Sequence, residues 1–291
     1  MKIMITGGKG QLGTDCARVL GGNHDVLSVD IDEGDITNYS EVEELVKGFN
    51  PNIIINCAAY TQVDECETEK AFAWKVNVDG PKNFALCLEK YGGQLVHISS
   101  DYVFDGKKKV PNPYVEEDDP HPVSYYGTTK YESEKVVRRI SDRHLIIRTA
   151  WMYGAQGHNF LKTMLRLALQ PPTNEIKVVN DQFGSPTWSH RLALQIERMI
   201  EANARGIYHA SAESYCTWYG LTVYFLESMG VSHRVVPCTS EEYPTPAKRP
   251  ENSILENQQL KKREINIMKP WQEDIDQFVA NFREHLINEV T

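Results

Sequence analysis

The sequence opens with MKIMITGGKGQLG (residues 1–13), and this stretch decides the fold. Its β-prone start predicts a strand, glycines follow at a spacing of three (Gly7, Gly10 and Gly13), and a helical pattern begins at Gln11 and Leu12. A strand, a tight glycine turn and a helix start in this order are typical of a dinucleotide-binding βαβ unit. Glycine allows the turn and the close approach of a pyrophosphate, which the N–H groups of the helix then face. An ordinary glycine loop is the competing interpretation.

Composition narrows the class of protein. The 291 residues are 41% hydrophobic and 24% charged, with a net charge of −9, which is typical of a folded protein and argues against nucleic-acid binding. No apolar run is long enough to span a membrane, and no secretion signal precedes the first strand, so we expect a cytoplasmic protein without membrane contact. The six cysteines form no Cys-x-x-Cys pair, which indicates free thiols and no metal cluster.

Strands and helices are expected to alternate as far as Arg148. Apolar runs predict strands at 25–29, 51–56, 94–98 and 144–148. Helices are expected from Ser40, as N-cap of a capping box with Glu43, to Lys47, from 68 to 91 with a break at Gly80-Pro81, and from 124 to 140. This alternation predicts an α/β fold, a Rossmann-type doubly wound parallel sheet with helices on both faces.

The second half has a looser pattern. Helices are expected at 159–169, 190–204, 218–229 and 272–287, short strands at 176–179 and 207–209, and an irregular segment at 239–250. We therefore predict an NAD(P)-binding Rossmann domain over residues 1–150. Residues 151–291 are expected to form mainly a smaller α/β substrate-binding domain, from which segments of about 178–210 return to the first domain.

Tyr126 and Lys130 form the second functional pattern. Residues four apart share one face of a helix, so both side chains are expected to point into one cleft. A free phenol has a pKa near ~10, and a neighbouring ammonium stabilises the phenolate and so lowers that pKa. Ser100, at the end of a predicted strand, supplies a hydroxyl at the same sheet edge. The competing interpretation is an exposed helix face.

Asp30 is the candidate ribose-binding acid, since it ends the second predicted strand at close to the expected distance from the glycines. Such an acid would bond a ribose 2′-hydroxyl and repel a 2′-phosphate, which favours NADH. Lys9 in the glycine loop could offset that repulsion. The competing interpretation is a surface loop acid, because Asp32, Glu33 and Asp35 crowd the same segment.

Taken together, the glycine loop, Tyr126 and Lys130 resemble the extended short-chain dehydrogenase/reductase superfamily. Longer motifs in both halves of the chain resemble the dTDP-4-dehydrorhamnose reductase family more closely. These motifs are NCAAYTQVD (56–64), SDYVFDG (100–106), RTAW (148–151), DQFGSPT (181–187), and Arg249-Pro250 followed by Ser253 and Leu255. The resemblance covers nearly the whole chain.

The resemblance implies a reduction of the C4 ketone of dTDP-4-dehydro-β-L-rhamnose to dTDP-β-L-rhamnose. It implies that Tyr126 gives a proton to the ketone oxygen, that Lys130 tunes Tyr126 and binds ribose, and that Ser100 hydrogen-bonds the ketone. Ser100, Asp101, Tyr102 and Trp151 would contact the substrate. Trp151 as a core residue at the domain boundary is a fair competitor. Lys248 and Arg249 are the best local cations for the substrate diphosphate, unless they form a solvated charged loop.

The resemblance also implies the cofactor and its contacts. It implies NADPH as the main reductant, with NADH accepted, and a dTDP-sugar as the substrate of a monomer or homodimer. Family members can share a structural Mg²⁺ at a dimer interface, where Asp15 stands here one methylene shorter than the usual glutamate; no catalytic metal is expected. The cofactor-binding residues would be Gly7, Gly10, Gln11, Leu12, Gly13, Asp30, Asp35, Ile36, Ala59, Tyr60, Thr61, Tyr126 and Lys130.

Two other functions fit the same fold. One is another enzyme of the extended superfamily, such as a nucleotide-sugar epimerase or a dehydratase. Tyr102, which follows Asp101, supplies no second carboxylate, and this weighs against dehydration. The other is a non-catalytic regulatory subunit, for which loss of the Tyr and Lys pair would be expected. Tyr126, Lys130 and Ser100 are all present, so turnover is the better hypothesis.

Overall fold

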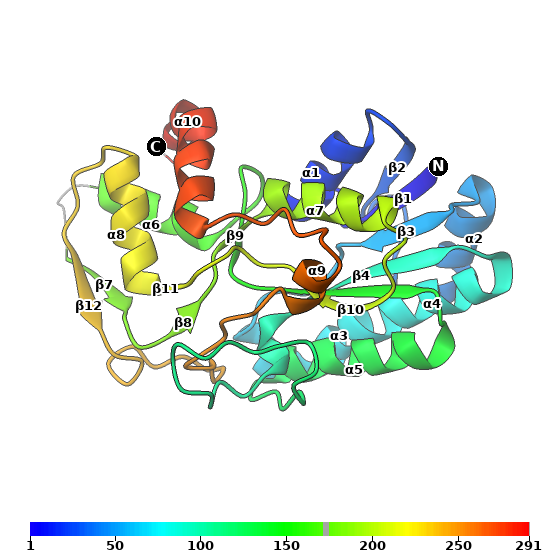
Figure 1. Cartoon of the computed structure of the whole chain (residues 1–291), viewed down its shortest axis with the longest axis horizontal. Coiled ribbons are helices and arrows are strands. Elements are labelled where there is room, and N and C mark those ends of the chain that lie inside the picture. The colour runs from blue at the N-terminus through cyan, green and yellow to red at the C-terminus, as the bar shows by residue number, and fades with distance from the viewer. Residues whose placement is uncertain (171–174, 291) are drawn as a thin grey trace.

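A six-stranded parallel sheet forms the centre of the computed structural model, which describes residues 1–170 and 175–290 (Figure 1). The strand order is β10-β5-β4-β3-β1-β2, with every neighbouring pair parallel. The strands are β1 (Lys2–Thr6), β2 (Asp25–Val29), β3 (Ile53–Asn56), β4 (Gln94–Ser100), β5 (His144–Thr149) and β10 (Gly206–His209). This confirms the predicted Rossmann-type doubly wound sheet.

Helices cover both faces of the sheet, so alternate residues of one strand pack into different cores. Ile3 and Ile5 of β1 pack with α1 (Gln11–Leu20) and α7 (Ser189–Glu201), which lie side by side above the sheet in Figure 1. Met4 packs into a second core on the opposite face. The helices of that face are α2 (Tyr39–Phe49), α4 (Gly80–Tyr91) and α5 (Tyr125–Ile140). Burial on both faces explains why β1 and β3 are continuously apolar.

The start of α2 differs from the prediction. Asn38 is the N-cap, and its side chain accepts a hydrogen bond from the Ser40 N–H. The Asn38 amide also donates to Glu41. Glu43 instead accepts bonds from Lys90 and Tyr91 of α4. The capping box predicted at Ser40 and Glu43 is therefore wrong, because Asn38 caps the helix two residues earlier.

The helical region before β4 is continuous from Lys70 to Tyr91, although a break was predicted at Gly80-Pro81. It comprises the 3₁₀ turn η1 (Glu65–Glu67), α3 (Lys70–Trp74), a π-helical segment η2 (Lys75–Asp79) and α4. Pro81, which has no N–H, stands in the first turn of α4, where an intrahelical partner is not needed. At Gly80-Pro81 the helix therefore changes from π-helical to α-helical hydrogen bonding, and it is not interrupted there.

A third apolar core lies in the C-terminal half, among α6 (Phe160–Leu169), α8 (Trp218–Ser228) and α10 (Trp271–Val290). Six short strands pair there among the described residues. The strand predicted at 176–179 is confirmed, and the other five had no signal in the sequence, since most of them have two residues. Their pairs are β6 (Met152–Tyr153) with β9 (Thr187–Trp188), β8 (Phe183–Gly184) with β11 (Cys216–Thr217), and β7 (Ile176–Val179) with β12 (Val235–Cys238).

Segments of the C-terminal half also join the first sheet. The sheet's edge strand β10 pairs with β5, and α7 packs beside α1, so the chain crosses back after residue 188.

The remaining elements are the 3₁₀ turn η3 (Asp101–Val103) and α9 (Gln258–Lys262). The division at residue 150 stays a prediction, and residues 171–174 and 291 of the predicted second domain lie outside the described residues. None of the described helices is long and apolar enough to cross a membrane.

Candidate active site

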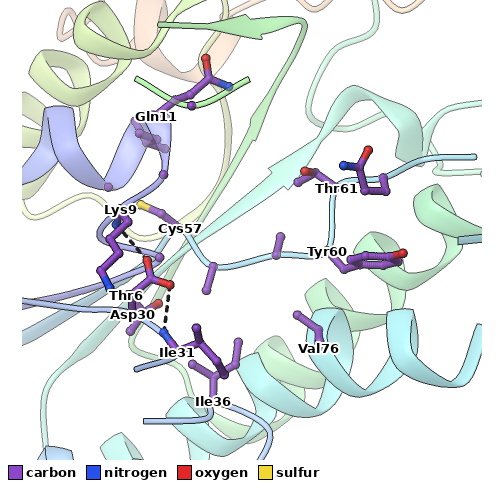
Figure 2. Close-up of a pocket in the computed structure, with 18 of the residues that line it drawn as sticks. Thr6, Lys9, Gln11, Asp30, Ile31, Ile36, Cys57, Tyr60, Thr61 and Val76 are labelled. Atoms are coloured by element: carbon purple, nitrogen blue, oxygen red, sulfur yellow. Dashed lines mark hydrogen bonds between the residues drawn. The ribbon is translucent and has the colours of Figure 1, made fainter. Parts of the chain in front are cut away.

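A cleft of about 820 Å³ lies at the carboxyl ends of β1, β2 and β3. Eleven of the predicted cofactor-binding residues line it, namely Gly7, Gly10, Gln11, Leu12, Gly13, Asp30, Asp35, Ile36, Ala59, Tyr60 and Thr61. Figure 2 shows Gln11, Asp30, Tyr60 and Thr61 arranged around this space. Segments far apart in the sequence therefore meet here, as expected for a ligand site at the edge of a parallel sheet.

Two glycines are required by the turn that follows β1. Gly7 has a φ of +67°, and a Cβ there would lie 2.8 Å from the main-chain nitrogen of Ala58. A Cβ on Gly13 would lie 2.1 Å from the Gly7 carbonyl oxygen. The first position therefore needs the left-handed conformation, and the second needs the absence of a side chain so that α1 can pack on the turn.

The N-terminus of α1 is open toward the cleft. Gly10 is its N-cap, so no side chain satisfies the N–H groups of the first turn, and that turn holds no acidic residue. N–H groups in a helix's first turn have no partner within the helix, and the helix dipole is positive there. The arrangement suits a bound pyrophosphate, and a nicotinamide dinucleotide therefore fits the residues present.

Asp30 holds the glycine turn against the end of β2. Its carboxylate accepts hydrogen bonds from the main-chain N–H groups of Lys9 (2.8 Å) and Ile31 (2.9 Å), which are the dashed lines in Figure 2. The Lys9 ammonium pairs with Asp32, and this hydrogen bond raises the pKa of Lys9 and lowers the pKa of Asp32. Asp30 is therefore an ordered part of the cleft wall.

Part of the cleft wall comes from the C-terminal half and was missed by sequence reasoning. Asn159 donates to the Gln11 side chain at 3.0 Å, and the Gln11 amide donates to the His158 carbonyl oxygen at 3.4 Å. Only tertiary structure brings this segment over α1, so no local signal marked it. Lys9, which was considered for the cofactor phosphate, also lines the cleft. The missed lining residues of both halves of the chain are Thr6, Val29, Ile31, Gly34, Thr37, Cys57, Ala58, Gln62, Phe72, Lys75, Val76, Met152, Gly157, His158, Asn159 and Thr163.

Tyr126 and Ser100 are brought together beyond this cleft wall, at the ends of α5 and β4. Tyr126 is partly buried, and its ring packs edge-on against Tyr102 at 5.7 Å between centroids. Burial raises the pKa of Tyr126, the Asp101 charge raises it further, and a hydrogen bond with Ser100 opposes both. The prediction that Lys130 would lower this pKa is wrong for the structure as it stands, because burial and Asp101 outweigh the opposing effects.

Lys130 is buried one helical turn after Tyr126. Its ammonium donates to the main-chain carbonyl of Ile98 in β4 at 2.7 Å. Burial lowers the pKa of Lys130 to about 8, while the charge of Glu134 raises it. The Glu134 carboxylate accepts two hydrogen bonds from the Arg148 guanidinium, from Nε at 2.9 Å and from Nη2 at 2.7 Å. Neither Lys130 nor Tyr126 borders the 820 Å³ cleft, so their contact with a cofactor stays a prediction.

The predicted substrate residues Asp101 and Tyr102 follow directly on Ser100. The Ser100 hydroxyl donates to Asp101 at 2.8 Å and accepts from the Tyr102 N–H at 3.1 Å. Burial raises the pKa of Asp101 to about 6, and the nearby hydroxyls of Ser253 and Ser100 oppose this effect. In standard hydrogen-bond geometry, Asp101 Oδ2 has no partner among the described residues. One buried acceptor thus remains for a polar ligand.

Arg249 is paired rather than solvated. Its guanidinium donates two bonds to Asp64, at 3.0 and 2.9 Å, and its side chain is 22% exposed. Burial lowers the pKa of Arg249, but the hydrogen bonds with Asp64 and, to a smaller extent, the interaction with Tyr102 raise it above its ordinary value. The Arg249–Asp64 pair therefore joins two motifs that are distant in sequence, 56–64 and 249–255, beside Tyr102. A substrate diphosphate would have to share the Arg249 guanidinium with Asp64.

Trp151 has an unusual backbone conformation for a large residue, with a φ of +46°. Its ring stacks on Trp218 with 3.6 Å between centroids and 6° between planes. A Cβ on Gly184 would come within 2.3 Å of the Trp151 ring. Strain of this kind is held by surrounding structure and is often found at functional sites. Both interpretations of Trp151, substrate contact and boundary core, remain open.

Asp15 does not provide a free metal ligand. Its carboxylate accepts bonds from Ser189 (2.5 Å) and from Arg18 (2.6 Å), whose charge balances it. Within residues 1–170 and 175–290, no cluster of three acidic, His or Cys side chains could hold a metal ion. Asp15 is thus already paired within the chain, and a structural Mg²⁺ shared between two copies stays a prediction.

Comparison with known proteins places this geometry in a family. Residues 1–284 match the family described as the RmlD substrate binding domain. A Burkholderia thailandensis protein named dTDP-4-dehydrorhamnose reductase is 38% identical over 281 residues, which cover 90% of this chain and 93% of that protein.

Two solved structures of proteins with the same name are also similar. The Clostridium acetobutylicum structure has a TM-score of 0.93 and 40% identity, covering 97% of this chain and 100% of its own. The Bacillus anthracis structure, a complex with NADP, has a TM-score of 0.92 and 37% identity, covering 96% of this chain and 99% of its own.

Proposed function

The chain belongs to the dTDP-4-dehydrorhamnose reductase family and is an NAD(P)H-dependent oxidoreductase; from this we propose that it reduces the C4 ketone of dTDP-4-dehydro-β-L-rhamnose to dTDP-β-L-rhamnose, with NADPH as the main reductant. The observation that carries the proposal is the position of Ser100 beside the partly buried Tyr126, next to a cleft built for a dinucleotide. The NADP complex of the similar Bacillus anthracis protein supports the choice of cofactor.

The cleft residues would hold the cofactor by its phosphates and ribose. N–H groups of Gln11 and Leu12 would bind the pyrophosphate, and Asp30 and Lys9 would meet the adenosine ribose, with Asp35 and Ile36 beside it. Ala59, Tyr60 and Thr61 would run along the remainder of the molecule. When bound, a reduced nicotinamide supplies the hydride that the ketone carbon needs.

Tyr126 would be the general acid. Its raised pKa keeps the phenol protonated at neutral pH, so a proton is available for the ketone oxygen as negative charge develops there. The Ser100 hydroxyl would turn its single hydrogen from Asp101 to the same oxygen and orient that oxygen toward Tyr126. Lys130, buried one turn along α5, would place a positive charge beside the phenolate that Tyr126 leaves and would bind ribose.

The sugar would lie against Asp101, Tyr102 and Trp151. The free oxygen of Asp101 would accept a bond from a sugar hydroxyl, which removes the cost of a buried acceptor without a partner. Trp151 would offer an aromatic face to the sugar or to the deoxynucleotide. In this view the cation of Arg249 binds the diphosphate while remaining paired with Asp64.

NADPH is proposed over NADH because the charge of Lys9 lies close enough to the proposed ribose acid Asp30 to interact with it, and NADH would be accepted less well. The surrounding carboxylates Asp30, Asp32 and Glu33 would limit that preference. We further propose residues 1–150 as the cofactor domain and 151–291 as mainly the substrate domain, a cytoplasmic location, a monomer or homodimer, and neither nucleic acid nor membrane as partner.

An absorbance assay at 340 nm tests the function. Purified protein, the dTDP-4-keto sugar and NADPH should give rapid oxidation of NADPH, and Tyr126→Phe should abolish most of it. NADH in parallel gives the cofactor preference. An epimerase would instead convert a nucleotide sugar without net oxidation of added cofactor, and a regulatory subunit would bind NADPH with no turnover, so either result would contradict the proposal.

A further inference from the structure

Three neighbouring strands carry a row of polar residues in the middle of an apolar sheet. Thr6 of β1 is in register with Asn56 of β3, which is in register with His97 of β4. Ser133 of α5 completes the row from the covering helix. All four side chains are at most 1% exposed. Polar groups buried this deeply are costly unless hydrogen-bonded, so their partners decide what they do.

If the His97 imidazole is neutral, the donors and acceptors along this row can be assigned in only one way. The Ser133 hydroxyl donates its single hydrogen to the Lys130 carbonyl at 2.6 Å, so it must accept from His97 Nε2 at 2.8 Å. His97 Nδ1 is then the acceptor for the Asn56 amide at 3.2 Å. Asn56 Oδ1 accepts from the Thr6 hydroxyl at 2.7 Å. Burial and the charge of Lys130 lower the pKa of His97, which keeps the ring neutral.

The two ends of this polar row lie at the two halves of the proposed active site. Thr6 lines the dinucleotide cleft, directly before Gly7. Ser133 holds the main chain of Lys130, whose ammonium bonds Ile98, the residue after His97. His97 is the central member, since it contacts both the sheet and the helix. Its ring makes the two middle hydrogen bonds of the row, with Asn56 and with Ser133.

We propose that His97 is a positioning residue that fixes α5, and with it Tyr126 and Lys130, relative to the glycine turn. The inference rests on the proposed function, since Tyr126 and Lys130 matter only if they react. A buried network whose members are all satisfied holds its elements in one geometry. Breaking it lets α5 shift on β4, and a shift of about 1 Å at reacting groups costs on the order of 10²-fold in rate.

Variants along the row separate positioning from simple stability. His97→Phe removes both ring bonds, and Ser133→Ala removes only the link to α5. His97→Gln places an amide N–H where Nε2 stands and should restore part of the activity. His209→Phe is the matched control, since His209 is also fully buried in the same sheet, and its ring nitrogens have no standard hydrogen bond among the described residues.

The kinetic expectation is a loss in kcat without a matching change in the KM for NADPH. Ser133→Ala and His97→Phe should lower kcat roughly 10- to 100-fold, with a larger primary isotope effect from 4-deuterated NADPH, because the chemical step is slowed. His97→Gln should lie between them and the wild type. Equal losses in His209→Phe, or an unchanged kcat in Ser133→Ala, would overturn the proposal.

A second readout does not depend on the reaction. With [ε-¹³C]lysine, the Lys130 signal should shift in Ser133→Ala and stay in place in His209→Phe, because the row holds Lys130 on β4. ¹⁵N spectra should show His97 as the Nε2–H tautomer. If the wild type gave these NMR results but did not reduce the sugar, the proposed function would be contradicted and the positioning role of His97 would not. An unmoved Lys130 signal, or an Nδ1–H tautomer, would refute the positioning role.

Discussion

The Lys130 ammonium donates to the main-chain carbonyl of Ile98 at 2.7 Å and is nearly excluded from solvent. With the bonds from His97 to Ser133 and from Ser99 to Glu134, it joins the helix that carries Tyr126 to the strand that ends at Ser100. A buried cation on a carbonyl is less stable than a hydrated one, and burial therefore lowers the pKa of Lys130 to about 8.

The first prediction follows from that pKa. Lys130 is charged below pH 8 and loses its charge as the pH rises through 8, so NMR of [ε-¹³C]lysine should show one lysine titrating near pH 8. The signal should disappear in Lys130→Met, which assigns it. Glu134→Gln should move the titration to lower pH, because the Glu134 charge raises this pKa. A Lys130 signal that titrates above pH 10 would contradict the burial argument.

A second prediction concerns Asp101 and stability. Its pKa of about 6 exceeds the ordinary value, so between about pH 4 and 6 the folded chain holds a proton that the unfolded chain has lost. Stability should therefore fall as the pH rises through this range, by up to about 3 kcal/mol from this group. Asp101→Asn should remove that dependence. Urea unfolding of the wild type and the variant at pH 4.5 and pH 7 measures this dependence. The same change in the free energy of unfolding between the two pH values in both proteins would refute the prediction.

The third prediction tests the glycine turn. Gly13→Ala would place a Cβ within 2.1 Å of the Gly7 carbonyl, so α1 must move from the turn. NADPH binding, measured by fluorescence titration, should weaken at least about tenfold, or about 1.4 kcal/mol. Gly48→Ala in α2 is the control, since a Cβ there meets nothing within 4 Å. That change should leave NADPH binding alone and stabilise the fold by about 0.5–1 kcal/mol.

Cofactor preference gives a fourth prediction. If Lys9 meets the 2′-phosphate, Lys9→Ala should raise the KM for NADPH about fivefold, a modest effect because the side chain is exposed. The KM for NADH should change less than twofold, which makes NADH the internal control. Equal changes for the two cofactors would show that Lys9 supports only the shape of the loop. The comparison should be made at fixed salt, because screening weakens exposed charges.

The fold could be predicted wherever the signal was local. The apolar strands, the glycine turn and the amphipathic helices each need only a few neighbouring residues to be recognised. The error at Ser40 shows the limit of such patterns, since Asn38 offers an equally good cap two residues earlier. The paired strands β7 and β12 were half missed, because β12 contains Pro237 and gains its strand character from pairing.

The candidate site was also predicted only in part, where its residues lie next to a local motif. Residues next to the glycine and strand-end motifs were found, including Asp30, Tyr60 and Thr61. Asn159 and His158 were not, because they reach the cleft only through the fold of the C-terminal half. The direction of the Tyr126 pKa was also missed, since the spacing to Lys130 says nothing of the burial and the Asp101 charge that raise this pKa.

The central claim is that this chain delivers a hydride to C4 of a dTDP-4-keto sugar beside Tyr126. The most direct test follows deuterium from 4-deuterated NADPH into the product by ¹H NMR and mass spectrometry. The account predicts one deuterium at C4 of dTDP-rhamnose with wild-type protein and almost none with Tyr126→Phe. Deuterium at another carbon, or product formed without deuterium, would contradict it.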